Sequence, residues 1–323
     1  MTFKKLFTTL TGVLLLATLL VACGTQKENT TTSSSKAKTT QKLAKTIEVT
    51  DSNGQKITVP THPSKVVVFD NGSLDTIEAL GQGQSVVGAA TSNLPDYLKA
   101  FKKVDNAGGL KEPDLEKINA LQPELIIISG RQESFKADLE KIAPVLYLST
   151  DANKVWQSTQ KNVLTLASIY GQASKAKTQL ASLTKKINAL KKKAEASNLT
   201  TLTVMSNEGQ LSAFGPGSRY GIINQTFGFK SVDDKIEATT HGQSVSFEYV
   251  LEKNPDLIFV IDRTKAIGGA SDGTPLADND LIKQTTAAKN GKVIELNPAV
   301  WYLSGGGLES TQLMLEEVEK ALN

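Results

Sequence analysis

Arginine is rare in this chain and falls at three places where it could bind an anion. Of 36 lysines and arginines, only Arg131, Arg219 and Arg263 are arginines. Arginine offers a planar fork of donors suited to anionic oxygens, and it stacks on aromatic rings, which lysine does poorly. All three are expected in loops, so they indicate recognition of a planar anion. The alternative is that each pairs with an internal acid such as Asp262, which explains one arginine more readily than three.

Two of these arginines end a repeated local pattern. Residues 114–131 and 246–263 align without a gap, and each begins with Asp or Ser and continues through a short helix, a proline and an apolar strand to the arginine. Asp and Ser are typical helix N-caps, and proline ends a helix. Ligands of open α/β sheets bind beyond the carboxyl ends of the strands, so Arg131 and Arg263 are expected beside a ligand. A helix–strand unit alone is weak evidence, and the repeated arginine strengthens it.

Few other residues could do chemistry. The chain has two histidines, His62 and His241, and one cysteine, which are too few for a His-rich divalent metal site. His62 precedes the first predicted strand and is interpreted as a surface or turn residue. His241 lies in a polar loop and Tyr302 follows the last predicted strand; taken alone, each is an ordinary surface residue. The motifs of serine hydrolases, P-loop enzymes, zinc proteases and dinucleotide-binding folds are missing from the sequence, which favours a binding protein.

The N-terminal residues have the pattern of a secretion signal. Two lysines precede the apolar residues 10–21, and a small residue comes directly before Cys23, the only cysteine. This pattern resembles a bacterial lipobox, in which residues 1–22 are removed and Cys23 is lipidated. A lipidated Cys23 would tether an otherwise soluble protein to the outside of a membrane. The alternative is a plain signal peptide or a short membrane anchor with an incidental cysteine.

A polar segment follows the signal. Residues 23–45 consist mainly of Thr, Ser, Lys and Gln and have too few apolar side chains to fold, so they are expected to form a disordered tether. Removal of residues 1–22 takes away two lysines and leaves 34 basic and 33 acidic residues. This near-neutral balance argues against nucleic acid as a partner.

Two segments of domain size follow the tether, residues 46–153 and 197–323. In both, apolar β-branched runs alternate with helical patterns, which is typical of parallel sheets covered on both faces. The predicted strands are 65–69, 85–89, 125–129 and 145–148 in the first segment and 201–206, 257–261 and 293–296 in the second. The predicted helices include 73–80, 113–121 and a closing helix at 309–322. The fold class is therefore α/β, with two lobes.

The segment between the lobes, residues 154–196, is predicted to be one long helix. It has no proline and a single glycine, Gly171, and its apolar residues recur at the three-and-four spacing of a buried helical stripe. Lysines fill the other face, so the helix is too polar to cross a membrane, and the apolar positions keep no strict heptad of a coiled coil. As the only crossing between the lobes, it predicts limited lobe movement.

With its lipobox, polar tether and two α/β lobes joined by a long helix, the chain resembles the class III (cluster A-II) solute-binding lipoproteins of ABC importers for ferric siderophores, haem and cobalamin. Within that family it is most similar to the binders of ferric catecholate siderophores, over nearly the whole mature chain. The resemblance implies a monomeric, non-enzymatic, extracellular receptor without a permanent cofactor that delivers its ligand to an ABC permease. Two alternatives stay open: haem or cobalamin as the ligand and, more remotely, a lipid-anchored hydrolase with His241 as base.

The resemblance also implies roles for single residues. Arg131, Arg219 and Arg263 match the arginines that surround the catecholate oxygens. His241 and Tyr302 match the pair that completes the Fe(III) shell when the ligand supplies only four donors. Fe(III) prefers anionic oxygen, so a phenolate suits it, and a neutral imidazole can fill a remaining position.

Two glutamates occupy the third position of the repeat, Glu116 in the first lobe and Glu248 in the second. In the family, one acidic residue on each lobe docks on the permease, and the resemblance assigns this role to these two. Surface glutamates are otherwise usually just solvated.

Overall fold

The computed structural model describes residues 44–269 and 275–322. The predicted signal peptide, the lipidation site Cys23 and the tether up to residue 43 lie outside the described residues. No helix of the described part is long and apolar enough to cross a membrane. The first element is an antiparallel hairpin that the sequence did not predict, β1 (Thr46–Thr50) with β2 (Lys56–Pro60), and it buries Val49 and Val59.

The N-terminal lobe contains a parallel sheet in the order β5-β4-β3-β6-β7. Its strands are β3 (Val66–Val68), β4 (Val86–Ala89), β5 (Asp105–Asn106), β6 (Leu125–Ile128) and β7 (Val145–Tyr147). Both faces of β3, β6 and β7 are buried, as the continuous apolar runs predicted. The strand order reverses at β3, which pairs with β4 on one side and β6 on the other. A crevice therefore opens beyond the ends of β3 and β6.

Short helices surround this sheet. They are α1 (Asn71–Ala79), η1 (Gly83–Ser85), η2 (Thr91–Asn93), η3 (Asp96–Lys103), α2 (Leu115–Leu121), η4 (Gly130–Phe135) and α3 (Lys136–Leu139). The predicted helices at 73–80 and 113–121 correspond to α1 and α2, with ends shifted by one or two residues.

The C-terminal lobe has a mixed sheet in the order β11-β9-β8-β12-β13, with β10 also paired to β8. Its strands are β8 (Thr200–Asn207), β9 (Gln210–Phe214), β10 (Lys230–Ser231), β11 (Gln243–Val245), β12 (Leu257–Asp262) and β13 (Val293–Glu295). The expectation of a parallel sheet holds for β8, β10, β12 and β13 and is wrong for β9 and β11. Glu208 and Gly209 both have positive φ, 51° and 77°, and form the two-residue turn that reverses the chain into β9.

The helices of this half are α6 (Ile222–Gln225), α7 (Phe247–Lys253), α8 (Arg263–Ala266), η5 (Leu276–Asp278), η6 (Ile282–Gln284), α9 (Thr286–Lys289), the π-helical turn η7 (Ala299–Leu303), α10 (Leu308–Glu319) and η8 (Lys320–Leu322). The predicted closing helix is α10 with η8.

The internal repeat is real. Asp114 and Ser246 cap α2 and α7 by accepting from the backbone N–H three residues on. Gln122 and Asn254, at the matching position before each proline, both end their helix in the left-handed conformation, with φ of 48° and 43°. Strands β6 and β12 follow, so the repeat builds the same helix-to-strand unit in each lobe.

The segment between the lobes is two helices, α4 (Val155–Ile169) and α5 (Ala173–Ser197), which corrects the expected single helix over 154–196. The break is at Gly171, whose φ of +65° ends α4 and whose missing Cβ leaves room for His62 Nε2, 2.9 Å from where that Cβ would lie. Helix α5 is the long helix that enters the second lobe at β8. Its buried residues keep the predicted spacing and are Ala176, Leu180, Leu183, Ile187, Leu190 and Ala194.

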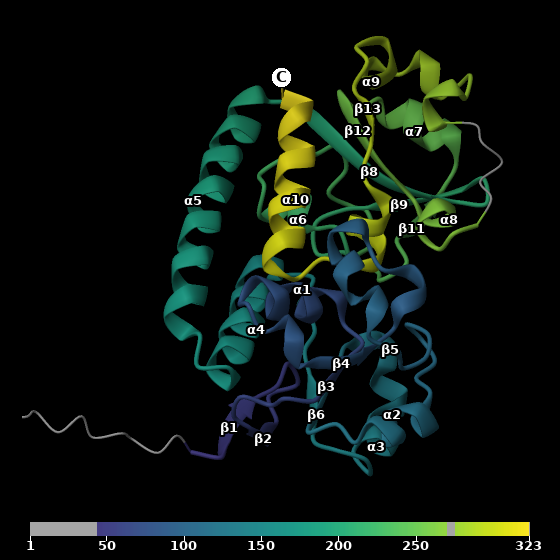
Figure 1. Cartoon of the computed structure of the whole chain (residues 1–323). Coiled ribbons are helices and arrows are strands. Elements are labelled where there is room, and N and C mark those ends of the chain that lie inside the picture. The colour runs from purple at the N-terminus through teal and green to yellow at the C-terminus, as the bar shows by residue number, and fades with distance from the viewer. Residues whose placement is uncertain (1–43, 270–274, 323) are drawn as a thin grey trace, which may run out of the picture. The chain divides into compact units, whose positions relative to one another are not determined.

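The chain crosses between the lobes a second time. After β13 it returns through residues 303–307 to α10, which packs on α1 of the N-terminal lobe and on α5. Figure 1 shows α10 beside α5 with its first turn next to α1. The expectation of a single crossing is therefore wrong, because the C-terminal segment is fastened to the first lobe.

Candidate functional site

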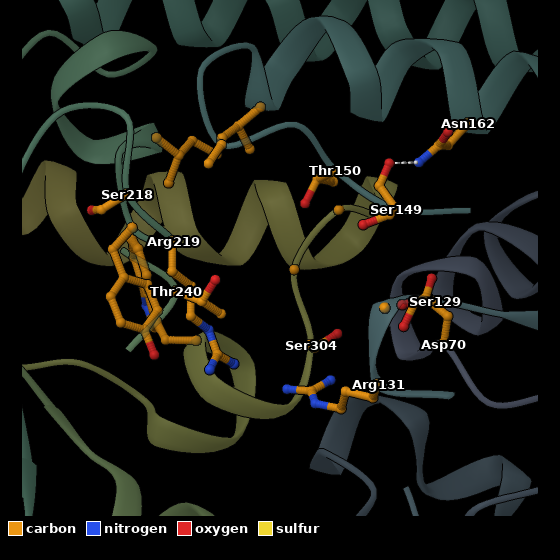
Figure 2. Close-up of a pocket in the computed structure, with 18 of the residues that line it drawn as sticks. Asp70, Ser129, Arg131, Ser149, Thr150, Asn162, Ser218, Arg219, Thr240 and Ser304 are labelled. Atoms are coloured by element: carbon orange, nitrogen blue, oxygen red, sulfur yellow. Dashed lines mark hydrogen bonds between the residues drawn. The ribbon is translucent and has the colours of Figure 1, made fainter. Parts of the chain in front are cut away.

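A cavity of 540 Å³ lies between the two lobes. Its N-terminal wall comes from the ends of β3 and β6, with Asp70 and Arg131. Its C-terminal wall includes Arg219 and Tyr220, and residues 304–306 of the return segment line it as well. Figure 2 shows Arg131 and Arg219 reaching into this space from different sides, with Ser304 near Arg131. The cavity is thus at the switch point where open α/β sheets bind ligands.

The arginines converge on Tyr302. Arg131 and Arg219 each donate from Nη2 to the carbonyl oxygen of Tyr302, over 2.7 and 2.5 Å. Arg263 donates from Nε to the Tyr302 hydroxyl over 2.8 Å, and from Nη1 to the side-chain oxygen of Asn207, the last residue of β8, over 2.6 Å. The guanidinium carbons lie 6.0, 4.4 and 5.6 Å from the Tyr302 ring centroid for Arg131, Arg219 and Arg263. Four residues that are far apart in sequence therefore form one cluster.

This cluster changes the acidity of the Tyr302 phenol. Partial burial acts to raise the pKa of Tyr302, but the hydrogen bond from Arg263 and the charges of the three arginines bring that pKa below its ordinary value. The phenol is consequently shifted toward phenolate, the form that binds a hard cation.

In the part of the chain that the structure describes, no carboxylate pairs directly with an arginine. None of the ion pairs among residues 44–269 and 275–322 involves an arginine. Asp262, the acid considered as a partner, instead caps α8 and pairs with Lys265 at 3.3 Å. Burial and the like charge of Arg219 lower the pKa of Arg131. The cavity is lined by two arginines and one acid, Asp70, so it keeps a net positive charge that an anionic ligand would offset.

The elements explain how these side chains reach the cavity. Arg131 is the second residue of η4, which follows β6 after Ser129, and Arg263 is the first residue of α8 directly after β12, so the prediction that both lie at strand ends is confirmed. The expectation that they lie in loops is wrong, because each strand runs into a short helical turn. Arg219 does lie in a turn, and its guanidinium is 5.4 Å from the ring centroid of the buried Tyr220.

Asp70 is the acid among the cavity-lining residues. It follows β3 and caps α1, where one carboxylate oxygen accepts from the backbone N–H and the hydroxyl of Ser73, both at 2.7 Å. Burial raises the pKa of Asp70, although Ser73 and the charge of Arg131 act to lower it. Another part of the cavity wall is neutral and polar. There Asn162 of α4 donates to the Ser149 carbonyl over 2.9 Å, as drawn in Figure 2.

The remaining predicted site residues lie apart from the cluster. His241 is exposed in the loop before β11, and its neighbours Thr239 and Thr240 line the cavity. Glu116 and Glu248 are exposed at the same position in the first turns of α2 and α7. These two glutamates are thus equivalent by the repeat and free to meet a partner.

Sequence reasoning missed several residues of the site. Tyr220 adjoins Arg219 in the glycine-rich loop and could have been found as its stacking neighbour. Asn207 ends β8 and Asp70 lies two residues after β3, so the strand-end rule that located the arginines could have found them. Asn71, which donates to the Leu303 carbonyl over 2.9 Å, had no signal in the sequence.

Comparison with known proteins agrees with this architecture. A family model described as a periplasmic binding protein matches residues 66–300. The petrobactin-binding protein YclQ of Bacillus subtilis is 46% identical over 321 residues, which cover 98% of this chain and 99% of YclQ. The crystal structure of YclQ has a TM-score of 0.85 and covers 87% of this chain and 99% of its own.

Two further solved structures belong to iron-related binding proteins. PiuA of Streptococcus pneumoniae, an iron uptake ABC transporter substrate-binding protein, is 46% identical with a TM-score of 0.81, and the match covers 85% of this chain and 98% of PiuA. VctP of Vibrio cholerae, a periplasmic catecholate-siderophore binding protein, is 30% identical with a TM-score of 0.78, and the match covers 85% of this chain and 99% of VctP. The family resemblance stated from the sequence is thus confirmed, and the chain belongs to the periplasmic binding protein family.

Proposed function

We propose that this protein binds a ferric catecholate siderophore and delivers it to an ABC importer. The observation that carries the proposal is the convergence of Arg131, Arg219 and Arg263 on Tyr302 beside the interlobe cavity, where no carboxylate of the described part of the chain forms an ion pair with them. The names of YclQ and VctP, which bind petrobactin and a catecholate siderophore, support the ligand class.

The chemistry of such a ligand fits the cluster. A ferric catecholate carries negative charge on flat aromatic rings, and arginine can hydrogen-bond to the oxygens and stack on the rings at the same time. Tyr302, with its lowered pKa, can supply a phenolate to iron when the siderophore leaves a coordination position open. His241 would reach the iron through movement of its loop, because its side chain is exposed in the free protein.

The protein acts as a receptor and not as an enzyme in this proposal. Its lipidated Cys23 and the tether after it would hold the two lobes at the outer face of the cell membrane as a monomer. The ligand is transported cargo, and the protein has no permanent cofactor. Glu116 and Glu248, one on each lobe, would dock on the permease subunits.

Titration of the intrinsic Trp and Tyr fluorescence with ferric bis- and tris-catecholates tests the proposal. Trp301 and Tyr220 line the cavity, so a bound ferric complex is expected to quench the emission at micromolar concentration or below. Haem and a corrinoid serve as competing ligands. If no ferric catecholate quenches the fluorescence, the proposal is wrong. A Soret band on haem addition, without catecholate binding, would favour haem as the ligand. Turnover of a reporter ester would instead indicate a hydrolase.

A further inference from the structure

The first turn of α10 is capped by a side chain from the other lobe. Its own N-cap, Gly307, has no side-chain oxygen to offer. Asp75 of α1 takes that role, accepting from the backbone N–H of Glu309 over 2.8 Å through one carboxylate oxygen and from that of Ser310 over 2.7 Å through the other. Asp75 is 1% exposed. A buried carboxylate therefore satisfies two helix donors that have no partner within α10.

Two glycines make this approach possible. A Cβ on Gly307 would lie 2.3 Å from Oδ2 of Asp75, and a Cβ on Gly72 would lie 2.3 Å from the carbonyl oxygen of Gly305. Gly307 has an ordinary φ of −115°, so space and not backbone conformation requires glycine there. The start of α1 and the return segment thus fit together only where side chains are absent.

Further contacts begin at the residue after Tyr302. Asn71 donates from Nδ2 to the Leu303 carbonyl over 2.9 Å, and the Tyr97 hydroxyl hydrogen-bonds to Ser304 Oγ. The return segment, residues 303–307, is therefore held to the N-terminal lobe at its start, and the first turn of α10 is held there directly after its end. It continues without a break from Tyr302, and its residues 304–306 form part of the cavity wall.

We propose that Asp75, assisted by Asn71, is a positioning residue for ligand binding, because it fixes the return segment and so holds Tyr302 where the three arginines meet. The inference rests on the proposed function. Burial of a carboxylate is costly, and here two N–H donors and the positive end of the α10 dipole offset part of the cost. Directional hydrogen bonds of this kind fix the place of a helix terminus more sharply than apolar contact does.

The test uses two variants with a matched control. Asp75→Asn keeps the shape but loses one of two acceptors, and Asn71→Ala removes the second attachment without touching Asp75. Thr285→Ala is the control. Thr285 is 0% exposed and caps α9 by accepting from the Ala288 N–H over 3.2 Å, so this variant also loses a buried helix cap. Thr285 does not line the cavity. Hydrogen–deuterium exchange of residues 299–310 without ligand is measured first, followed by the affinity for a ferric bis-catecholate.

Both variants are expected to speed exchange in residues 299–310 and to weaken binding about 10-fold, as the loss of a buried hydrogen bond does, while Thr285→Ala changes neither. Wild-type affinity in both variants would overturn the inference, and so would an equal loss of affinity in Thr285→Ala. If Asp75→Asn fails to fold, the same two measurements on Asn71→Ala decide the test. If the wild-type protein binds no ferric catecholate, the proposed function is wrong, and the positioning role for that ligand is wrong with it. If the wild type binds the ligand and both variants bind it equally well, only the positioning role is wrong.

Discussion

Arg131 and Arg219 come from different lobes and donate to one acceptor, the carbonyl oxygen of Tyr302. A neutral carbonyl brings the two guanidinium groups together but does not cancel their charge. Hydrogen bonding thus organises the site before a ligand arrives. A bound anion would offset the electrostatic repulsion between the two guanidinium groups.

Replacing either of these arginines by lysine tests whether the planar fork matters. Arg131→Lys and Arg219→Lys keep the charge but lose the paired donors, so each is expected to weaken binding of a ferric catecholate by about 10- to 100-fold. Alanine at the same positions should weaken it further. Fluorescence titration measures the effect, with exposed Lys103→Ala as the control. Wild-type affinity in the lysine variants would show that charge alone suffices.

Direct ligation of iron by Tyr302 and His241 has a spectroscopic consequence. With a tetradentate ferric catecholate bound, Tyr302→Phe is expected to shift the charge-transfer band, because the phenolate leaves the iron shell. His241→Ala should shift it too if the loop brings the imidazole to the metal. A band left unchanged in both variants would mean that neither residue ligates iron. A hexadentate tris-catecholate, which fills the shell itself, is the matched control ligand.

Asp75 makes stability depend on pH in a defined direction. Burial raises its pKa from 3.8 to about 6, and the nearby charge of Glu309 adds to this rise, while the N–H groups of Glu309 and Ser310 act against it. Because the folded state holds the proton more tightly, the contribution of Asp75 is full below pH 3.8 and is lost as pH rises through about 6. The difference between wild type and Asp75→Asn in free energy of unfolding should therefore move in favour of the wild type on acidification, by on the order of 3 kcal/mol.

Urea unfolding of both proteins between about pH 4 and pH 7, a range that covers most of the interval between the pKa values of 3.8 and about 6, gives this difference directly. Titrating groups that do not interact with Asp75 are shared by the two proteins and cancel, and Tyr97, whose pKa is raised by burial and by Asp75, does not titrate in this pH range. A difference that stays constant with pH would contradict the raised pKa of Asp75.

The break between α4 and α5 predicts the effect of a side chain at Gly171. Gly171→Ala must adopt a φ of +65° and also brings its Cβ close to the exposed ring of His62, which can turn away, so it is expected to lower the free energy of unfolding by about 1 to 2 kcal/mol, mostly through backbone strain. Gly54→Ala is the control, because Gly54 has a φ of +80° with open space around it and reports backbone strain alone. In the double variant His62→Ala/Gly171→Ala, the loss of free energy of unfolding caused by Gly171→Ala should decrease to that of Gly54→Ala. Equal losses in Gly171→Ala and Gly54→Ala would exclude a role for His62.

Docking on a permease through the repeat can be separated from ligand binding. Glu116→Ala and Glu248→Ala are expected to bind ferric catecholate normally and to reduce uptake by cells, most strongly as a double variant. Glu112→Ala and Glu252→Ala, at nearby exposed positions, should leave uptake unchanged. Full uptake by the double variant would remove these glutamates from the proposed interface.

Local sequence determined much of the framework. The repeat with its caps and prolines placed Arg131 and Arg263 at strand ends, because capping and apolar runs depend on residues close in the chain. The buried stripe of α5 was readable for the same reason. Gly171 was visible as the one glycine of that segment, but its neighbour His62, more than a hundred positions earlier, was needed to show why the helix breaks there.

Tertiary structure decided how the site is assembled. Tyr302 receives hydrogen bonds from three arginines spread from position 131 to 263, and Asp75 caps a helix that starts more than two hundred residues later. Such contacts leave no periodic trace, because each partner satisfies only its own local pattern. The sequence thus determined which residues could bind an anion, and the return of the chain to the first lobe decided that they meet around Tyr302.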